Sequence, residues 1–482
     1  MLAPVRTTDT PHGNRGRLLA RVGAMTSGLE RARQKMAAAG ATDAAIDVFS
    51  HYYQQLGTAG GGYIREDSIE PLTDPPRLAS VDIDPDVARD ALARTAIIKL
   101  NGGLGTSMGL DGPKTLLPVR GRKTFLDILV AQVLRARERY DARLPLIFMN
   151  SFRTRQATLD HLERYDDLAV GDLPIDFLQG FEPKLTRDTL EPIAWPADPT
   201  LEWCPPGHGD IYTSLVGTGL LDRLVAAGFR YASIANGDNL GAGPNATLAG
   251  WFAQSGAPYA AEVCPRTPND RKGGHLAIRR SDGRLILRDT AQTAPEELEY
   301  FTDEYRHPYF HANNLWVDLE ALGRLMAERH NVLGLPLIRN EKTVDPADKT
   351  TPEVIQLETA MGAAIEVFPG AQAIAVERDR FLPVKTTNEL MLVRSDAFAL
   401  DGDARLLATT ERLPAVSLDK RFYALLPDFE ARVEFVPSLR EARSLTVHGD
   451  WTFADTVTVV GDAVLPDEGE PRTVDAEVIG QQ

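Results

Sequence analysis

The sequence predicts an α/β protein built around a mostly parallel sheet, and two patterns support this class. Short apolar segments alternate with longer segments of helical periodicity, which is the order expected for repeated β–α–β units. Glycine-rich loops follow several apolar segments, and open α/β sheets bind ligands beyond the carboxyl ends of their strands. The strand candidates are residues 96–100, 145–149, 231–235 and 259–263, and the clearest helix candidates are residues 125–137 and 212–227.

The length of 482 residues is enough for two or three domains. Residues 1–25 are rich in arginine and poor in acids, and we expect them to form a disordered leader. Apolar side chains at helical spacing then predict two short helices, divided near Gly40, within an N-terminal helical segment over residues 26–75. The α/β domain is expected over residues 76–395. Residues 396–482 carry a helix candidate near 420–429 and closely spaced short strands, which are typical of a small solenoid or sandwich.

Composition excludes several classes of function. The net charge of -16 argues against binding to nucleic acid, because contact with a phosphate backbone needs clustered lysine and arginine. The chain lacks an apolar stretch of the length that crosses a bilayer, so no membrane association is expected. The two cysteines, Cys204 and Cys264, show neither a pairing pattern nor metal-ligand spacing, which favours a reducing compartment such as the cytoplasm.

The most informative segment is TAIIKLNGGLGTSMGLDGPKTLLPV, residues 95–119, in which a strand candidate runs into five glycines and then Pro113 and Lys114. It is not a Walker loop, because the proline interrupts the Gly-Lys pair and removes an amide that would bind phosphate. It is not a dinucleotide fingerprint either, because its glycine spacing is one residue too long. Glycines nevertheless let backbone amides approach a triphosphate, and a lysine offers positive charge to the same oxygens. We therefore interpret the segment as a phosphate-binding loop, with a glycine-rich turn that binds no ligand as the structural alternative.

Four further segments place polar residues where a ligand could bind. The segment WCPPGHGD sets His208 between glycines, where an imidazole can contact phosphate. The segment ANGDNLG places Asp238 directly after a strand candidate, a position that suits a carboxylate ligand of Mg²⁺. FHANNLW offers Asn313 and Asn314 to sugar hydroxyls, and FLPVKTT carries Lys385 as a second cation. Each segment also has a structural interpretation. His208 can be a solvated histidine, and Asp238 can belong to an Asx turn or a helix cap. The asparagine pair can form a turn, and Lys385 can be a surface lysine.

Taken together, the motifs resemble the UTP–glucose-1-phosphate uridylyltransferase family of the eukaryotic type, also called UDP-glucose pyrophosphorylase. Eight segments carry the resemblance in the same order over about residues 30–460: KLNGGLGTSMGLDGPKT, MNSF, WCPPGHGDIY, NGDNLGA, KGG, NNLW, IQLETAMGAAI and FLPVKTT. The resemblance implies a Rossmann-like nucleotidyltransferase domain with a mixed, mostly parallel sheet, followed by a C-terminal left-handed β-helix. It also implies that UTP and glucose 1-phosphate are the substrates and that Mg²⁺ is the cofactor.

The resemblance implies a role for each site residue. Leu100, Gly102 and Gly103 would lie along the uridine, and Gln179 and the Gly207 backbone would contact the uracil edge. Lys114 and Lys385 would bind phosphates, His208 would lie near the sugar phosphate, and Asp238 would hold the metal. The residues that would surround the hexose are Asn236, Gly274, Asn313, Asn314 and Glu358.

The implied reaction is a direct in-line displacement that gives UDP-glucose and pyrophosphate. A phosphate oxygen of glucose 1-phosphate would attack the α-phosphorus of UTP, without a covalent intermediate. Both reactants are polyanions and the nucleophile is already ionised, so catalysis needs cations and fixed geometry more than a general base. Lys114, Lys385 and Mg²⁺ on Asp238 would supply that positive charge.

Two alternatives stay open beside this interpretation. A UDP-N-acetylglucosamine pyrophosphorylase, or a pyrophosphorylase with broad UDP-sugar specificity, would use the same chemistry, but its loop usually has arginine at the position of Ser107. A non-catalytic nucleotide-sugar sensor would be a protein of another class, and it would not need both lysines and the metal carboxylate. His275 departs from the family, which usually has a small hydroxyl residue there, and the sequence does not fix the oligomeric state.

Overall fold

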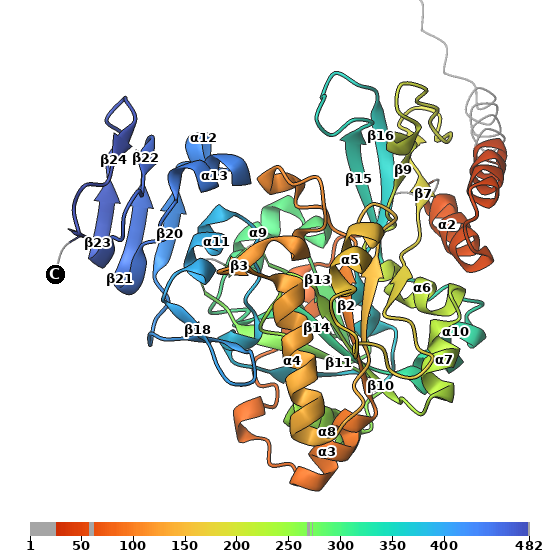
Figure 1. The fold of residues 1–482 in the computed structure, drawn as a ribbon. Coiled ribbons are helices and arrows are strands. Elements are labelled where there is room, and N and C mark those ends of the chain that lie inside the picture. Colours follow the sequence, from red (N-terminus) through yellow and green to blue (C-terminus); the bar gives the residue numbers. More distant parts are fainter. Residues whose placement is uncertain (1–25, 57–61, 268–269, 272, 481–482) are drawn as a thin grey trace, which may run out of the picture. The chain divides into compact units, whose positions relative to one another are not determined.

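The computed structural model describes residues 26–56, 62–267, 270–271 and 273–480. These residues fall into two compact units, and each unit is assembled from three separate stretches of the chain (Figure 1). The first unit contains the described residues up to 63 together with 180–218 and 325–364. The second unit contains 64–179, 219–324 and 365–482, again without the undescribed positions. The leader predicted over residues 1–25 lies outside the described residues.

The second unit contains a seven-stranded sheet. All neighbouring strands are parallel except for β14, which is antiparallel to both of its neighbours, β10 and β11. The predicted mixed and mostly parallel sheet is therefore confirmed, as are the four strand candidates. In spatial order the strands are β17 (Gln372–Ala375), β11 (Tyr259–Pro265), β14 (Tyr309–Asp318), β10 (Tyr231–Asn236), β2 (Thr95–Asn101), β5 (Leu146–Asn150) and β6 (Asp176–Leu178).

Helices cover this sheet, so its central strands are buried on both faces and consist of nearly continuous apolar runs. Helix α4 (Phe125–Tyr140), predicted over 125–137, starts at a capping box of Thr124 and Asp127. Helices α3 (Pro85–Ala93) and α8 (Ala246–Ser255) begin after the capping side chains of Asp84 and Asn245. Three further helices are α5 (Arg155–Leu162), α9 (Leu298–Thr302) and α10 (Leu319–Glu328).

The loops that follow β2 and β10 begin at the same edge of the sheet. The two strands are parallel neighbours, and their register pairs Asn236 with Leu100. The first loop, residues 102–117, contains two short 3₁₀ turns, Thr106–Met108 and Lys114–Leu116. The second loop runs from Gly237 to the start of α8. The ligand-binding position that the strand order predicts is therefore occupied by the two loops that the sequence singles out.

Two helix candidates differ from prediction because each is interrupted. Residues 212–227 form α6 (Ile211–Gly217) and α7 (Leu220–Ala226), with Gly219 between them at a φ of 71°. That left-handed conformation ends a helix and favours glycine. The C-terminal candidate likewise forms α12 (Lys420–Tyr423) and α13 (Leu426–Arg432), and the second of these has a proline in its first turn.

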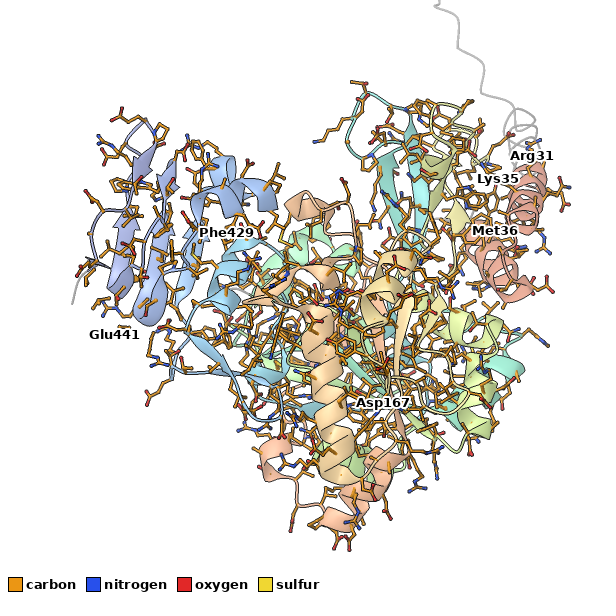
Figure 2. The ribbon with its side chains drawn as sticks, in the orientation of Figure 1. Arg31, Lys35, Met36, Asp167, Phe429 and Glu441 are labelled. Atoms are coloured by element: carbon orange, nitrogen blue, oxygen red, sulfur yellow. The ribbon has the colours of Figure 1, made fainter. Side chains whose placement is uncertain are left out.

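The first unit is built from helices and small antiparallel sheets. Residues 26–38 and α2 (Asp43–Gln55) are the two predicted N-terminal helices. They bury Met36, Phe49 and Tyr53 in one cluster with Ile355 and Leu357. The sheets are β15 (Leu337–Thr343), β16 (Glu353–Thr359) and β8 (Leu185–Thr186), and the pair β7 (Glu182–Pro183) and β9 (Trp203–Cys204). Figure 2 shows Arg31, Lys35 and Met36 on the first helix.

The C-terminal residues form short parallel strands that stack on one another. One parallel sheet contains β20 (Ala415–Leu418), β21 (Ser438–Val447), β23 (Thr458–Leu465) and β25 (Val478–Gly480). A second parallel pair is formed by β22 (Trp451–Thr452) and β24 (Arg472–Thr473). Figure 2 shows Glu441 on β21 and Phe429 on α13. Successive parallel strands are typical of a solenoid rather than of an antiparallel sandwich.

The second unit also contains three smaller pairings. β1 (Ile69–Pro71), β12 (His275–Arg279) and β13 (Leu285–Arg288) form an antiparallel sheet, and β3 (Pro118–Arg120) pairs with β4 (Lys123–Thr124). α11 (Thr387–Arg394) leads to the hairpin of β18 (Phe398–Leu400) and β19 (Leu406–Ala408). Among the helices of the described residues, none combines the length and the apolar character that crossing a membrane requires.

Candidate active site

The glycine-rich loop brings Lys114 to Asp238, which lies on the neighbouring loop. The ammonium Nζ of Lys114 donates to Asp238 Oδ2 at 2.6 Å, although the two residues are 124 positions apart. The loop closes through a bridge between Leu104 and Pro113, which sets the lysine at its exit. The two side chains keep 16% and 21% of their surface exposed, so a ligand can reach both charges.

Gly102 and Gly103 leave the backbone of this loop uncovered in two different ways. A Cβ atom on Gly102 would lie 2.8 Å from Cδ of Gln179 and closer still to its amide oxygen, so a larger residue there would displace the Gln179 side chain. A Cβ on Gly103 would have no neighbour within 4 Å. Leu100 is half-buried at the end of β2, and its carbonyl accepts from the Gly237 amide at 2.8 Å. The Gln179 amide therefore lies against Gly102, whereas the space beside Gly103 is open.

Two of the predicted sugar ligands lie together near Asp238. Asn313 Nδ2 donates to Asn236 Oδ1 at 3.3 Å, and both residues are half-buried. Asn313 has a φ of 57°, a left-handed conformation that asparagine tolerates better than most residues. This pair presents amide donors and acceptors beside the metal-binding candidate.

Asn314 differs from its neighbour because its side chain lies in the interior. It is 1% exposed, its amide nitrogen donates to Glu262 Oε2 at 3.0 Å and to the Arg380 carbonyl at 3.1 Å, and its oxygen accepts from Asn239 at 3.0 Å. These bonds use both donors and one acceptor position of the amide. The structure thus joins Asn313, but not the Asn314 side chain, to the accessible group.

Gly274 and Lys385 lie at the ends of other segments of the second unit. Gly274 directly precedes β12, its carbonyl accepts from the His311 amide at 2.8 Å, and a Cβ there would lie 3.1 Å from Cγ of Asp289. Lys385 is exposed just before the capping box of α11. Its segment is attached to the Asp238 loop by a bridge between Asn239 and Pro383.

His275, the departure from the family pattern, is an interior residue. Its ring is fully buried and stacks on the His307 ring with a centroid distance of 3.9 Å. Burial and the neighbouring His307 hold the pKa of His275 well below its usual range, so the imidazole is neutral. The unusual residue is therefore the first residue of β12, and its side chain packs in the interior.

The first unit carries the other three candidates. Gly207 has a φ of 79°, and a Cβ there would lie 2.6 Å from the Thr359 carbonyl, so the position requires glycine. Next to it, His208 Nδ1 accepts from the Met361 amide at 2.9 Å. Glu358 on β16 accepts from Lys342 Nζ at 3.2 Å. Residues 204–210 are thereby packed on the turn that follows β16.

Several charged residues near these loops were not predicted. Lys99, on β2, is 2% exposed and donates to the Ala242 carbonyl at 2.6 Å, and burial lowers its pKa to about 7. Glu262 and Arg380 form a buried ion pair. Asp210 is also buried, and burial raises its pKa to about 6. The signal for Lys99 and Glu262 was available, because each interrupts an otherwise apolar strand. A charge in such a strand indicates a buried partner.

Comparison with known proteins identifies the family. Residues 46–460 match the UTP–glucose-1-phosphate uridylyltransferase family. A probable enzyme of that name from Schizosaccharomyces pombe is 35% identical over 87% of this chain and 82% of its own length, and the potato enzyme is 37% identical over 81% and 80%. The Trypanosoma brucei UDP-glucose phosphorylase structure aligns with a TM-score of 0.86 at 39% identity, covering 95% of this chain and 99% of its own.

A further solved structure, a variant of Leishmania major UDP-glucose pyrophosphorylase in complex with UDP-glucose, aligns with a TM-score of 0.87 at 39% identity. It covers 94% of this chain and 97% of its own. The family match spans most of the sequence, and the relatives are matched over most of their length. The chain therefore belongs to the UTP–glucose-1-phosphate uridylyltransferase family.

Proposed function

We propose that the protein transfers a uridylyl group from UTP to glucose 1-phosphate and so makes UDP-glucose and pyrophosphate. The observation that carries this proposal is the pair of Lys114 and Asp238, held at 2.6 Å where the glycine-rich loop meets the loop after β10. In a chain of this family, that pair offers one cation for phosphate and one carboxylate for a metal. UTP and glucose 1-phosphate are the proposed substrates.

The residues around Asp238 fit a magnesium ion. Mg²⁺ prefers oxygen ligands and usually takes one or two carboxylates from the protein, with phosphates and waters completing its shell. Asp238 and the amide oxygen of Asn236 supply such donors, and no cluster of three or more His, Cys, Asp or Glu suited to metal binding occurs among the described residues. When bound, Mg²⁺ would neutralise charge on the phosphates of UTP.

The chain's own residues would do the remaining work by charge and position. Lys114 would bind triphosphate oxygens from the loop exit, and Lys385 would bind phosphates from the segment attached at Asn239. Backbone amides at Gly102 and Gly103 would approach the nucleotide closely. No nucleophilic side chain is required, because the sugar phosphate is already ionised and attacks the α-phosphorus directly.

We propose the following contacts with the nucleoside and the sugar. Leu100 and Gly102 would line the uridine, with Gln179 at the uracil edge, and Gly274, Asn236 and Asn313 would contact the hexose. Asn314 would act from the interior. On the first unit, the Gly207 backbone would contact uracil, His208 the sugar phosphate and Glu358 the hexose.

We propose that residues 76–395 act as the catalytic domain and that the parallel strands within 396–482 form a left-handed β-helix. The two cysteines that the structure describes are free and buried, which supports a reducing compartment, and we propose the cytoplasm.

The test is to incubate the purified protein with UTP, MgCl₂ and glucose 1-phosphate and to measure pyrophosphate release. Release that depends on all three additions is the expected result. Binding of UTP without release would favour a sensor. Parallel reactions with N-acetylglucosamine 1-phosphate and galactose 1-phosphate decide the sugar, and a preference for either of them would replace glucose 1-phosphate in the proposal.

A further inference from the structure

A buried polar cluster lies behind the proposed catalytic loops. Its centre is the ion pair of Glu262 on β11 and Arg380, whose side chains are 0% and 9% exposed. The guanidinium makes two parallel bonds to the carboxylate, at 3.0 and 2.7 Å. Trp316 Nε1 and Asn314 Nδ2 each add a bond of 3.0 Å, so both carboxylate oxygens accept twice. Although burial alone would raise the pKa of Glu262, its bonds to Arg380, Trp316 and Asn314 lower it, and the carboxylate is charged.

Asn239 connects this ion pair to two segments at once. Its amide nitrogen donates to Asn314 and, at 3.1 Å, to the Arg380 carbonyl, and its oxygen accepts from the amides of Gly241 at 3.2 Å and Leu382 at 2.8 Å. Asn239 directly follows Asp238, and Leu382 lies three residues before Lys385. We call Asn239, Glu262, Asn314, Trp316 and Arg380 the buried frame.

Other interior side chains fix the loop that carries Asp238. The Gly243 carbonyl accepts from Arg380 Nη1 at 2.8 Å, and the Leu240 carbonyl accepts from Gln132 at 3.0 Å. Lys99 holds the Ala242 carbonyl, and a Cβ on Gly241 would lie 2.6 Å from the Arg380 carbonyl carbon. The carbonyls at 240, 242 and 243 are thus all bound by side chains from other elements.

An ion pair in the interior needs a reason beyond stability. Removing two charges from water is costly, and apolar residues of similar volume often stabilise a fold equally well. A fully bonded polar network instead specifies one arrangement of the groups it joins. Here the network joins Asn239, which is the neighbour of Asp238, to the segment that leads to Lys385.

We propose that Glu262, Arg380, Asn239 and Asn314 are positioning residues that fix Asp238 relative to Lys385. The inference rests on the proposed function. The frame would hold the two loops in the geometry needed for in-line attack, where a displacement of about 1 Å can lower the rate about 100-fold. Asn314 would then serve the sugar site through its bonds to the interior rather than by direct contact.

The first experiment measures loop order without relying on activity. Hydrogen–deuterium exchange is recorded for peptides covering 236–243 and 381–386 in the wild-type protein and in Glu262→Gln. We expect exchange to rise by at least 10-fold in both segments together. A rise in neither segment, or in one alone, would overturn the proposed coupling, whatever reaction the protein catalyses.

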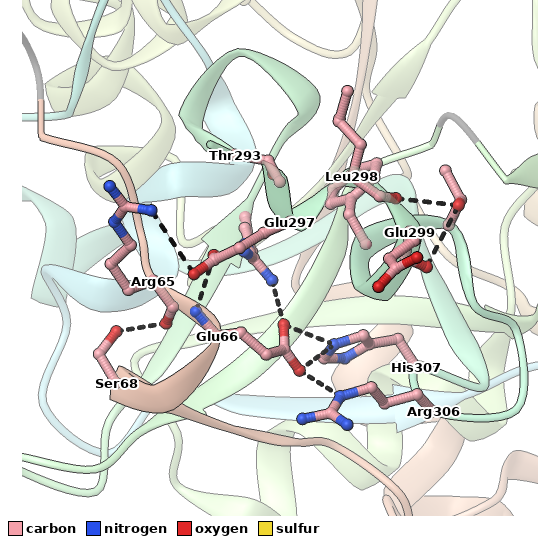
Figure 3. A network of polar contacts seen from close by, with 12 residues as sticks. Arg65, Glu66, Ser68, Thr293, Glu297, Leu298, Glu299, Arg306 and His307 are labelled. Atoms are coloured by element: carbon pink, nitrogen blue, oxygen red, sulfur yellow. Dashed lines mark hydrogen bonds and ion pairs between the residues drawn. The ribbon is translucent and has the colours of Figure 1, made fainter. Parts of the chain in front are cut away.

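Glu66→Gln is the matched control because Glu66 belongs to a second buried cluster in the same unit. It accepts from Arg288, Arg306 and His307, and Glu297 accepts from the Glu66 amide (Figure 3). Arg288 is fully buried, and the members of the frame are buried as well. Within the described part of the chain, none of the hydrogen bonds of Glu66 reaches either loop segment. The control should lower thermal stability without raising exchange in those two segments.

The second experiment is a double-mutant cycle on turnover. Asn239→Ala and Lys385→Ala are made singly and together, and kcat and KM for UTP are measured well below each melting temperature. Asn239→Ala alone should lower kcat at least 10-fold while KM for UTP changes less than 3-fold. When Lys385→Ala is already present, the Asn239→Ala substitution should lower kcat by less than a further 3-fold. Effects that simply multiply would show that Asn239 does not act through Lys385.

The outcomes separate this inference from the proposed function. If the wild-type protein releases no pyrophosphate, the proposed function fails, and the exchange experiment alone decides whether the frame couples the loops. If Glu262→Gln does not fold, Asn239→Ala replaces it in the exchange experiment. A folded frame variant with wild-type exchange and wild-type kcat would remove these residues from any positioning role.

Discussion

Replacing Gly102 with alanine should weaken UTP binding with little effect on folding. The new Cβ would lie 2.8 Å from Cδ of Gln179, whereas an ordinary contact starts at 3.4 Å, so the amide must move by more than half an ångström. Gln179 is a flexible, half-buried side chain, and its displacement should change the free energy of unfolding by no more than about 0.5 kcal/mol. The loss falls instead on the proposed contact with uracil.

The size of the effect follows from one hydrogen bond. A neutral hydrogen bond contributes a net 0.5 to 1.5 kcal/mol, so the dissociation constant for UTP should rise about 2- to 13-fold. Discrimination against CTP should fall as well, because Gln179 would recognise the edge at which the two bases differ. Isothermal titration calorimetry with UTP and CTP gives both numbers, and a thermal melt checks the fold.

Gly112→Ala is the control for this substitution. Gly112 belongs to the same loop, and a Cβ there would have no neighbour within 4 Å. It should bind UTP like the wild-type protein. A contrary result would be two folded variants with the same dissociation constant for UTP and the same dissociation constant for CTP. In that case Gln179 does not contact the base, and the assignment of the uridine site is wrong.

Four further substitutions test the charges. Lys114→Ala and Lys385→Ala should each lower kcat at least 100-fold because each removes a cation from the transition state, and wild-type pyrophosphate release by either variant would exclude that lysine from the mechanism. Asp238→Asn should raise the Mg²⁺ concentration for half-maximal activity at least 10-fold; an unchanged magnesium titration would make Asp238 a turn residue. Burial raises the pKa of Asp210 from an ordinary value near 4 to about 6, so the folded state binds that proton more tightly and the free energy of unfolding should fall by about 2 kcal/mol as pH rises from 4 to 6. Urea unfolding of Asp210→Asn should lack this decline, and parallel curves for variant and wild type would contradict the shift.

Local patterns predict most of the sheet and the two loops, because they depend on neighbouring residues. The apolar run before Asn101 and the glycines after it are sufficient to indicate a strand followed by a ligand-binding loop. The helix break at Gly219 was not predicted, although Gly217 and Gly219 lie two residues apart in that candidate, because glycine inside a helical pattern is often tolerated. The conformation of that glycine depends on packing that the pattern does not contain.

The interior of the site could not be predicted in the same way. Asn313 and Asn314 are adjacent and chemically identical, yet one is half-buried near Asn236 and the other is enclosed by Glu262 and Arg380. Which of the two turns inward depends on strands far away in sequence. The antiparallel pairing of Thr186 with Val354 is a similar case, since no short-range signal connects residues so distant.

The N-terminal helices have a consequence for synthesis of the chain. Their apolar face, which includes Phe49 and Tyr53, is buried in one cluster with Ile355 and Leu357, about 300 residues later. At translation rates of about 5 to 20 residues per second, that partner emerges roughly 15 to 60 s after the helices. During this interval the nascent chain exposes an aromatic surface on the ribosome. The two N-terminal helices can therefore complete their hydrophobic cluster only after the segment that carries Ile355 and Leu357 has been synthesised.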